Sequence, residues 1–182
     1  HTNFKLGAEV SGLSHKSLKT PSDVSLNIEG DSRMDSETLS VSEIKKLSLR
    51  GPGGLDVSGS LWVESPLPAK PEVLKARADL KGTLPSQQWL GAQLPGVLPP
   101  ALTFGIPTWT LKADHGLLSN VDLTLNLPFL SWSDAAFSYS APLDKVTVTA
   151  QLDSKTQELK DLKMTFGWGA LVSGEVLASG SE

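Results

Sequence analysis

The sequence predicts an all-β protein, an antiparallel meander of about 11–13 strands with one short helix. Apolar and polar residues alternate with period two along most of the chain, which is typical of strands that have one apolar face. Clusters of Gly, Pro, Asp and Ser separate these segments at short intervals, and short connections favour antiparallel pairing. In addition, one strand–turn–strand stretch returns near the C-terminus.

The repeated stretch is a β-hairpin pattern at residues 41–63, VSEIKKLSLRGPGGLDVSGSLWV. Alternation runs up to the Gly-Pro-Gly-Gly turn at 51–54 and resumes after it. A shift of 115 positions places residues 42–63 on 157–178 without a gap. Identical residues then meet at Glu43, Lys45, Leu47, Gly54, Val57, Ser58 and Gly59. A repeated hairpin indicates an array of like units.

This repeat defines the expected domain organisation. Residues 1–182 are interpreted as a single β-repeat segment of a longer protein. Sub-units 23–65 and 144–178 repeat the hairpin, and residues 66–143 join them. The joining part contains a proline-rich break at 84–100.

The remaining strands are expected wherever alternation is clear, and turn residues are expected to separate them. The polar residues 31–37 are interpreted as a turn, and Pro128 is expected to end a strand. The strands outside the opening hairpin are expected at residues 4–13, 23–30, 72–82, 102–106, 109–113, 121–127, 135–140, 146–152, 159–166 and 170–178.

The segment 84–100 differs from the rest and predicts the one helix, near 86–94. Pro85 is expected in its first turn. Trp89, Leu90 and Leu94 would then share one side, and the prolines from Pro95 onward would stop the helix. We interpret these three apolar residues as a lid for the sheet.

Composition and charge exclude several function classes. The net charge is −4 and the pI is about 5.4, which argues against nucleic acid as a partner. The chain has no cysteine, so disulfides and thiolate chemistry are excluded. Its three histidines show no metal-ligand spacing, and no acid–base pair or nucleophile motif is found. We therefore expect no enzyme, no metal and no cofactor.

An array of strands with one apolar face must cover that face. A second sheet, closure into a barrel, or an apolar ligand could do so, and alternation is the same in each case. In a closed β-sandwich, the chain would be a structural or interaction module of a surface or secretion protein that binds protein or glycan. Its five tryptophans would serve that binding.

A sheet that curls without closing would instead leave an apolar groove. Exposing such a groove to water is unfavourable by roughly 25 cal/mol per Å², so an acyl chain would bind there strongly. The residues expected to line the groove are Leu26, Ile28, Leu47, Leu49, Val57, Leu61, Leu123, Leu125, Val146, Val148, Leu162 and Val172.

The repeat also resembles a known family. Residues 39–61 follow the pattern Leu-x-Val-x-x-Ile-x-x-Leu-x-Leu-x-Gly … Leu-x-Val-x-Gly-x-Leu, which is similar to the repeating unit of AsmA/TamB-like envelope proteins. Residues 159–176 resemble a second copy. The segment 79–84, followed by Pro85 and the apolar stretch 89–98, resembles the short helices between such repeats.

The resemblance implies a β-taco, a long curled sheet whose apolar interior carries phospholipid between the inner and outer membranes of a diderm bacterium. It also implies a periplasmic location, a membrane anchor outside this segment, and a role of related proteins in outer-membrane biogenesis with a barrel partner. The twelve groove residues would then solvate phospholipid acyl chains. The proline-rich run 95–100 departs from the pattern of a continuous groove.

Overall fold

The structure, a computed structural model, describes residues 1–13, 22–36, 39–66, 73–116, 118–153, 156, 158–168 and 172–178. The strands are β1 Thr2–Leu13, β2 Ser22–Ser36, β3 Leu39–Arg50, β4 Asp56–Pro66, β5 Lys75–Thr83, β6 Leu102–Phe104, β7 Thr108–His115, β8 Leu118–Ser133, β9 Ser138–Asp153, β10 Leu159–Trp168 and β11 Val172–Ala178. The helix α1 spans Gln87–Gln93, and a 3-10 turn, η1, spans Pro52–Gly54.

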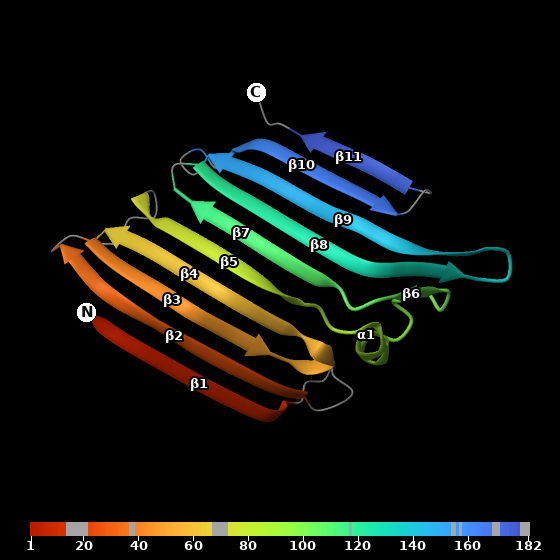
Figure 1. Ribbon diagram of the computed structural model, residues 1–182, viewed down its shortest axis with the longest axis horizontal. Coiled ribbons are helices and arrows are strands. Elements are labelled where there is room, and N and C mark those ends of the chain that lie inside the picture. Colours follow the sequence, from red (N-terminus) through yellow and green to blue (C-terminus); the bar gives the residue numbers. More distant parts are fainter. Residues whose placement is uncertain are drawn as a thin grey trace.

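All strands belong to one antiparallel sheet (Figure 1). The order is β1-β2-β3-β4-β5-β7-β8-β9-β10-β11, and β6 pairs with β8 outside this path. Strands β1 and β11 lie at opposite edges, so the sheet does not close (Figure 1). The prediction of an open all-β meander with one short helix is confirmed, and the closed sandwich is wrong for the part of the chain that the structure describes.

Strand β2 is longer than expected. The interpretation of residues 31–37 as a turn is wrong, because β2 continues through Asp31 to Ser36. Asp31 pairs with Asn3 on one side and with Glu43 on the other. Pairing on both sides overrides the low strand propensity of aspartate.

Strand β8 also passes the residue that was expected to end it. Pro128 lies inside β8, where the register against β9 shifts between Leu127 and Leu130. Proline cannot donate to a ladder and is tolerated at such irregularities. The two strands expected at 135–140 and 146–152 are also continuous. They form one strand, β9, which runs from Ser138 to Asp153 and includes Pro142.

A register shift in β3 keeps its apolar residues on one face. Ile44 and Leu47 are three residues apart, a spacing that would place them on opposite faces of a regular strand. Between them Lys45 is unmatched in the pairing with β2, which goes from Glu29↔Lys46 directly to Gly30↔Ile44. In β10 the pairing with β9 likewise omits Lys160, between Leu159 and Leu162. Each bulge restores the alternation after one extra residue.

The proline-rich segment leaves the sheet and returns to it at the same point. Strands β5 and β7 pair directly up to Thr83↔Thr108, and the amide of Leu84 donates to the carbonyl of Pro107 at 2.9 Å. The segment 84–107 therefore projects from the end of the sheet without interrupting it (Figure 1).

Helix α1 lies within this projection. Pro85 lies before the helix, and not in its first turn as the sequence predicts. Ser86, the next residue, caps the helix, and its side chain accepts a hydrogen bond from the Trp89 amide. The Ser86 amide donates to the Gly53 carbonyl at 2.8 Å. The Gln87 side chain donates to the Leu102 carbonyl at 2.6 Å and accepts from the Phe104 amide at 2.8 Å. These bonds fix α1 between η1 and β6.

The sheet has almost no buried core. Among the described residues, the buried hydrophobic side chains are Val41 at 5% exposure and Leu127 at 8%, and no large side chain is fully buried. A sheet normally buries one face against a second layer. Here one apolar face is left without such a layer among the described elements.

Candidate functional site: the uncovered apolar face

Strand register shows which side chains share a face, because residues that are directly paired point to the same side of a sheet. The central row crosses every strand of the main path. It consists of Leu6, Ile28, Leu47, Gly59, Leu80, Leu111, Leu123, Val148, Met164 and Val176. Apart from Gly59, each member is an aliphatic residue or methionine.

Two further rows flank the central row on the same face. The row toward η1 consists of Ala8, Leu26, Leu49, Val57, Gly82, Trp109, Leu125 and Val146. The row on the other side consists of Phe4, Gly30, Ile44, Leu61, Ala78, Ala113, Val121, Ala150, Leu162 and Ala178. We call the face that bears these three rows the apolar face.

The structure brings the residues expected from the sequence together in these rows. The central row contains Ile28, Leu47, Leu123 and Val148, and the row toward η1 contains Leu26, Leu49, Val57, Leu125 and Val146. Leu61 and Leu162 lie in the third row. Val172, in β11, pairs with Trp168 of β10. The Val172 side chain lies outside the described residues.

Sequence reasoning missed several members of the rows. Leu80, Leu111 and Met164 complete the central row in β5, β7 and β10. Alternation within each strand places them on the apolar side, but only the cross-strand register shows that they continue one line. The unmatched residues of β3 and β10 carry no comparable sequence signal.

Apart from Val172, whose side chain lies outside the described residues, the expected groove residues are half-buried, and exposure increases toward both edges. Leu6 on β1 is 54% exposed and Val176 on β11 is 49% exposed. The indole Nε1 of Trp109 is buried without a hydrogen-bond partner. The three rows thus offer a continuous surface with almost no hydrogen-bonding groups, and leaving it in water costs roughly 25 cal/mol for each Å².

A shallow hollow of about 320 Å³ lies on the apolar face over β4, β5, β7 and β8. Small side chains, Ala76, Ala78 and Ala113, form its floor, and larger ones, Leu61 and Val121, border it. Its size is at the lower end of the range for ligand sites.

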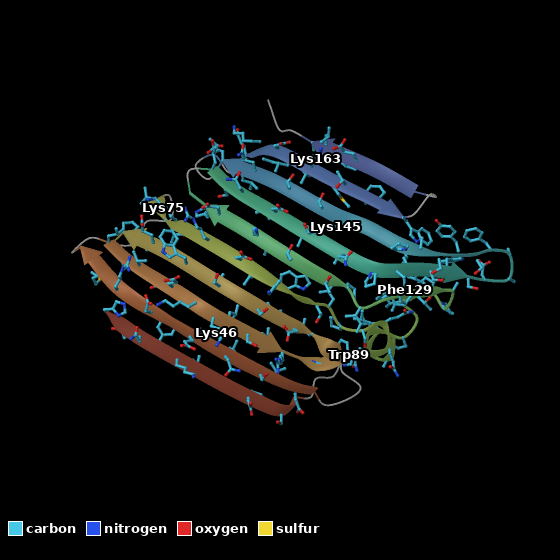
Figure 2. All side chains as sticks on the ribbon, viewed as in Figure 1. Lys46, Lys75, Trp89, Phe129, Lys145 and Lys163 are labelled. Carbon is cyan, nitrogen blue, oxygen red and sulfur yellow. The ribbon has the colours of Figure 1, made fainter. Side chains whose placement is uncertain are left out.

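The opposite face is polar. One line of paired residues across it contains Ser58, Lys81, Thr110, Thr124, Thr147 and Thr165. The hydroxyls of Thr147 and Thr165 lie 2.5 Å apart. Side chains such as Lys46 and Lys163 mark this face in Figure 2. The two faces therefore differ sharply in chemistry.

A larger hollow, of about 750 Å³, lies on this polar face. Residues of β3–β5 and β7–β10 line it, among them Trp62, Arg77, Asp114, Asn120 and Gln151. The Arg77 guanidinium lies 5.4 Å from the centre of the Trp62 ring and contacts the Asp114 carboxylate at 3.4 Å. Gln151 donates to Asn120 at 2.9 Å. Arg77, Asp114, Asn120 and Gln151 are thus already bonded to one another in pairs within the sheet.

An ion pair accompanies the bulge in β3. Asp31 is only 6% exposed, and its carboxylate accepts from the Lys45 ammonium at 2.5 Å. This hydrogen bond, with the attraction between the two charges, raises the pKa of Lys45 above its usual value. The extra residue of the bulge therefore supplies the cation that partners a buried carboxylate.

The residues expected to form a lid lie at the rim of the sheet. Trp89 packs against Gly53, where an added Cβ would lie 2.6 Å from the ring. Leu90 is half-buried and Leu94 is 47% exposed. Figure 2 shows Trp89 at one end of the sheet. Whether these side chains cover a ligand stays a prediction.

The described residues contain no group of three His, Asp or Glu side chains placed to hold a metal ion. Within the same residues, no helix is long and apolar enough to cross a membrane. Comparisons with protein-family models, curated proteins and solved structures found no match for the chain.

Proposed function

We propose that the chain is a lipid-binding segment whose apolar face holds phospholipid acyl chains and that it performs no catalysis. The observation that carries this proposal is the central row, which crosses the sheet from β1 to β11 under no second layer of described residues. An acyl chain has no hydrogen-bonding groups, and the three rows offer almost none. A flexible chain can also follow a twisted surface that a rigid partner would have to match in shape.

The wider role follows from the resemblance of the repeat to AsmA/TamB-like proteins. We infer that the segment forms part of a periplasmic conduit for phospholipid between the inner and outer membranes, or that it serves outer-membrane biogenesis with a barrel partner. Strands are about 4.8 Å apart, so each added strand lengthens the apolar face by that amount. The headgroups would stay in water while the rows solvate the tails.

Native mass spectrometry of protein from the periplasm of a diderm host tests this proposal. We expect phospholipid to copurify with the natural chain. Leu123→Asn, in the central row, should reduce the bound fraction at least about tenfold, since it places a polar amide against the tails. Thr124→Asn changes the neighbouring residue on the polar face and should leave binding unchanged. A folded, lipid-free natural chain would contradict the proposal.

The hollow on the polar face favours a second candidate, a module that binds a glycan or a protein. The amides and carboxylates that line this hollow can bind hydroxyl groups. Arg77 covers one face of the Trp62 ring, so that face is not free to stack on a sugar. Saturation-transfer NMR with oligosaccharides tests this candidate. It predicts transfer signals that disappear in Asn120→Ala, whereas the acyl-chain proposal predicts none.

A further inference from the structure

One end of the sheet collects most of the aromatic residues. This end bears η1, the segment 84–107 and the β8–β9 turn. Every tryptophan except Trp62 and Trp109, every phenylalanine except Phe4, and the single tyrosine lie there. We call this region the aromatic end. Trp89 and Phe129 mark it in Figure 2.

The aromatic end has almost no charge. The sequence contains no charged residue between Lys81 and Lys112. Between Asp122 and Asp144, the only one is Asp134. Its carboxylate accepts from the Trp132 indole at 2.9 Å and from the Ala136 and Phe137 amides at 2.8 Å each. Among its described residues, this end therefore offers no cluster of cations to an anionic partner, and Arg50, next to η1, is paired with Asp56 at 3.3 Å.

Two projections form this end: the segment 84–107, and the β8–β9 turn with the strand ends that flank it. Backbone pairing joins them. Strand β6, from the first projection, pairs with β8 through Leu102↔Trp132 and Phe104↔Leu130. The Ser133 amide donates to the Ala101 carbonyl at 2.9 Å, and the Gly105 amide donates to the Phe129 carbonyl at 3.1 Å. These bonds hold the projections as one platform with paired backbone groups.

The platform exposes large apolar side chains, with indole and phenol rings behind them. The exposed fractions are 47% for Leu94, 64% for Val97, 51% for Ile106, 43% for Phe129 and 48% for Phe137. Behind them, Tyr139 stacks with Phe137 at 6.3 Å and meets the Trp168 ring edge-on at 5.1 Å. The Trp168 indole donates to the Leu130 carbonyl at 3.1 Å.

We infer that the aromatic end docks onto the interface of a lipid bilayer with uncharged or zwitterionic headgroups. The exposed aliphatic and phenylalanine side chains would enter the acyl region, while Trp and Tyr lie at the level of the headgroups, where their amphipathic rings are favoured. Because the described residues of this end form no cluster of cations, attraction to anionic lipid contributes little. This inference stands on a different surface from the acyl-chain proposal and does not depend on it.

Flotation of the folded chain with vesicles of pure phosphatidylcholine tests the inference. We expect binding that is unchanged between low and high salt. Phe137→Ser and Val97→Ser should each weaken it about tenfold, as the loss of one inserted apolar side chain implies. Leu118 is 46% exposed at the opposite end of β8, so Leu118→Ser is the matched control and should bind as the natural chain does.

Quenching by brominated phosphatidylcholine gives the orientation. The double variant Trp62→Phe, Trp109→Phe removes the two tryptophans that lie away from the aromatic end, and the fluorescence of its three remaining tryptophans should still be quenched. Three results of the binding measurements would overturn the inference: no binding by folded protein, binding that requires anionic lipid and disappears in salt, or equal losses in Leu118→Ser and Phe137→Ser. Crosslinks from position 137 to a protein in place of lipid would also overturn it. Vesicle flotation and acyl-chain copurification are separate readouts, so each proposal can fail alone.

Discussion

At the scale of single residues, glycines mark the places where neighbouring strands approach too closely for a side chain. A Cβ on Gly30 would lie 2.1 Å from the Glu43 carbonyl oxygen and 2.8 Å from the Phe4 ring. The ring of Phe4 therefore covers the glycine on the next strand. Phe166 covers Gly174 in the same manner, with 2.6 Å to an added Cβ. Both pairs lie at the two edge hairpins of the sheet.

This crowding predicts the effect of alanine at two glycines. Gly30→Ala should lower the free energy of unfolding by about 1–3 kcal/mol, because the backbone or the Phe4 ring must move. Gly91, in α1, has no atom within 4 Å of an added Cβ. Gly91→Ala should therefore raise the free energy of unfolding by about 0.5–1 kcal/mol, if α1 unfolds with the sheet. Urea denaturation measures both, and equal effects of the two changes would refute the explanation.

The β8–β9 turn should depend on pH through Asp134. Hydrogen bonds from the Trp132 indole and from the Ala136 and Phe137 amides lower the pKa of this carboxyl below 3.8. Its contribution to stability is therefore complete above that value and is lost as the pH falls through the lower folded pKa. Protection of the Ala136 and Phe137 amides against hydrogen exchange should decrease over that range. Asp134→Asn should remove the pH dependence, and an unchanged profile in this variant would contradict the assignment.

At the scale of elements, the bulges of β3 and β10 decide which face each apolar residue occupies. Ile44 and Leu47 share the apolar face only because Lys45 is an extra residue. A shift by one residue sends a whole set of side chains to the other face of a sheet. The bulge in β3, the pairing of β3 with β2, and the ion pair between Lys45 and Asp31 thus act together in this part of the sheet.

The bulge predicts that deletions at two nearby positions of β3 differ greatly. Deleting Lys45 removes the extra residue and leaves Ile44 and Leu47 two positions apart, so both stay on the apolar face and the main loss is the cation beside Asp31. Deleting Ser48 makes Leu47 and Leu49 adjacent, so one of them moves to the polar face and the cooperative unfolding transition should weaken or disappear. Circular dichroism during urea titration compares the two. A Lys45 deletion as damaging as the Ser48 deletion would show that Lys45 is not the extra residue of the bulge.

The elements also show how far the sequence could be interpreted. Alternation predicted the groove residues of β2, β3, β4, β8 and β9, because each strand has one apolar face. It failed at Asp31 and Pro128, where pairing partners and a bulge carry the strand past residues that usually end it. The aromatic end could not be found from the sequence, because it joins residues 84–107, 128–139 and 166–168 through the register of β6, β8 and β10.

At the scale of the whole molecule, the sheet separates two chemistries across a single layer. Alternation is the same in open and closed sheets, so only the topology establishes that β1 and β11 remain edges. The apolar rows reach both edges, where Leu6 and Val176 are largely exposed. The function of the sheet therefore depends on what occupies the apolar face.

Photo-crosslinking within the periplasm of a diderm host tests that point most directly. A photoreactive residue replaces Leu125 or Val148 on the apolar face, and matched controls carry it at Thr124 or Thr147, which pair with each other on the polar face. We expect phospholipid adducts by mass spectrometry at the first two positions and none at the controls. Adducts to protein alone at Leu125 and Val148, or no adducts in a chain shown to be folded, would contradict it.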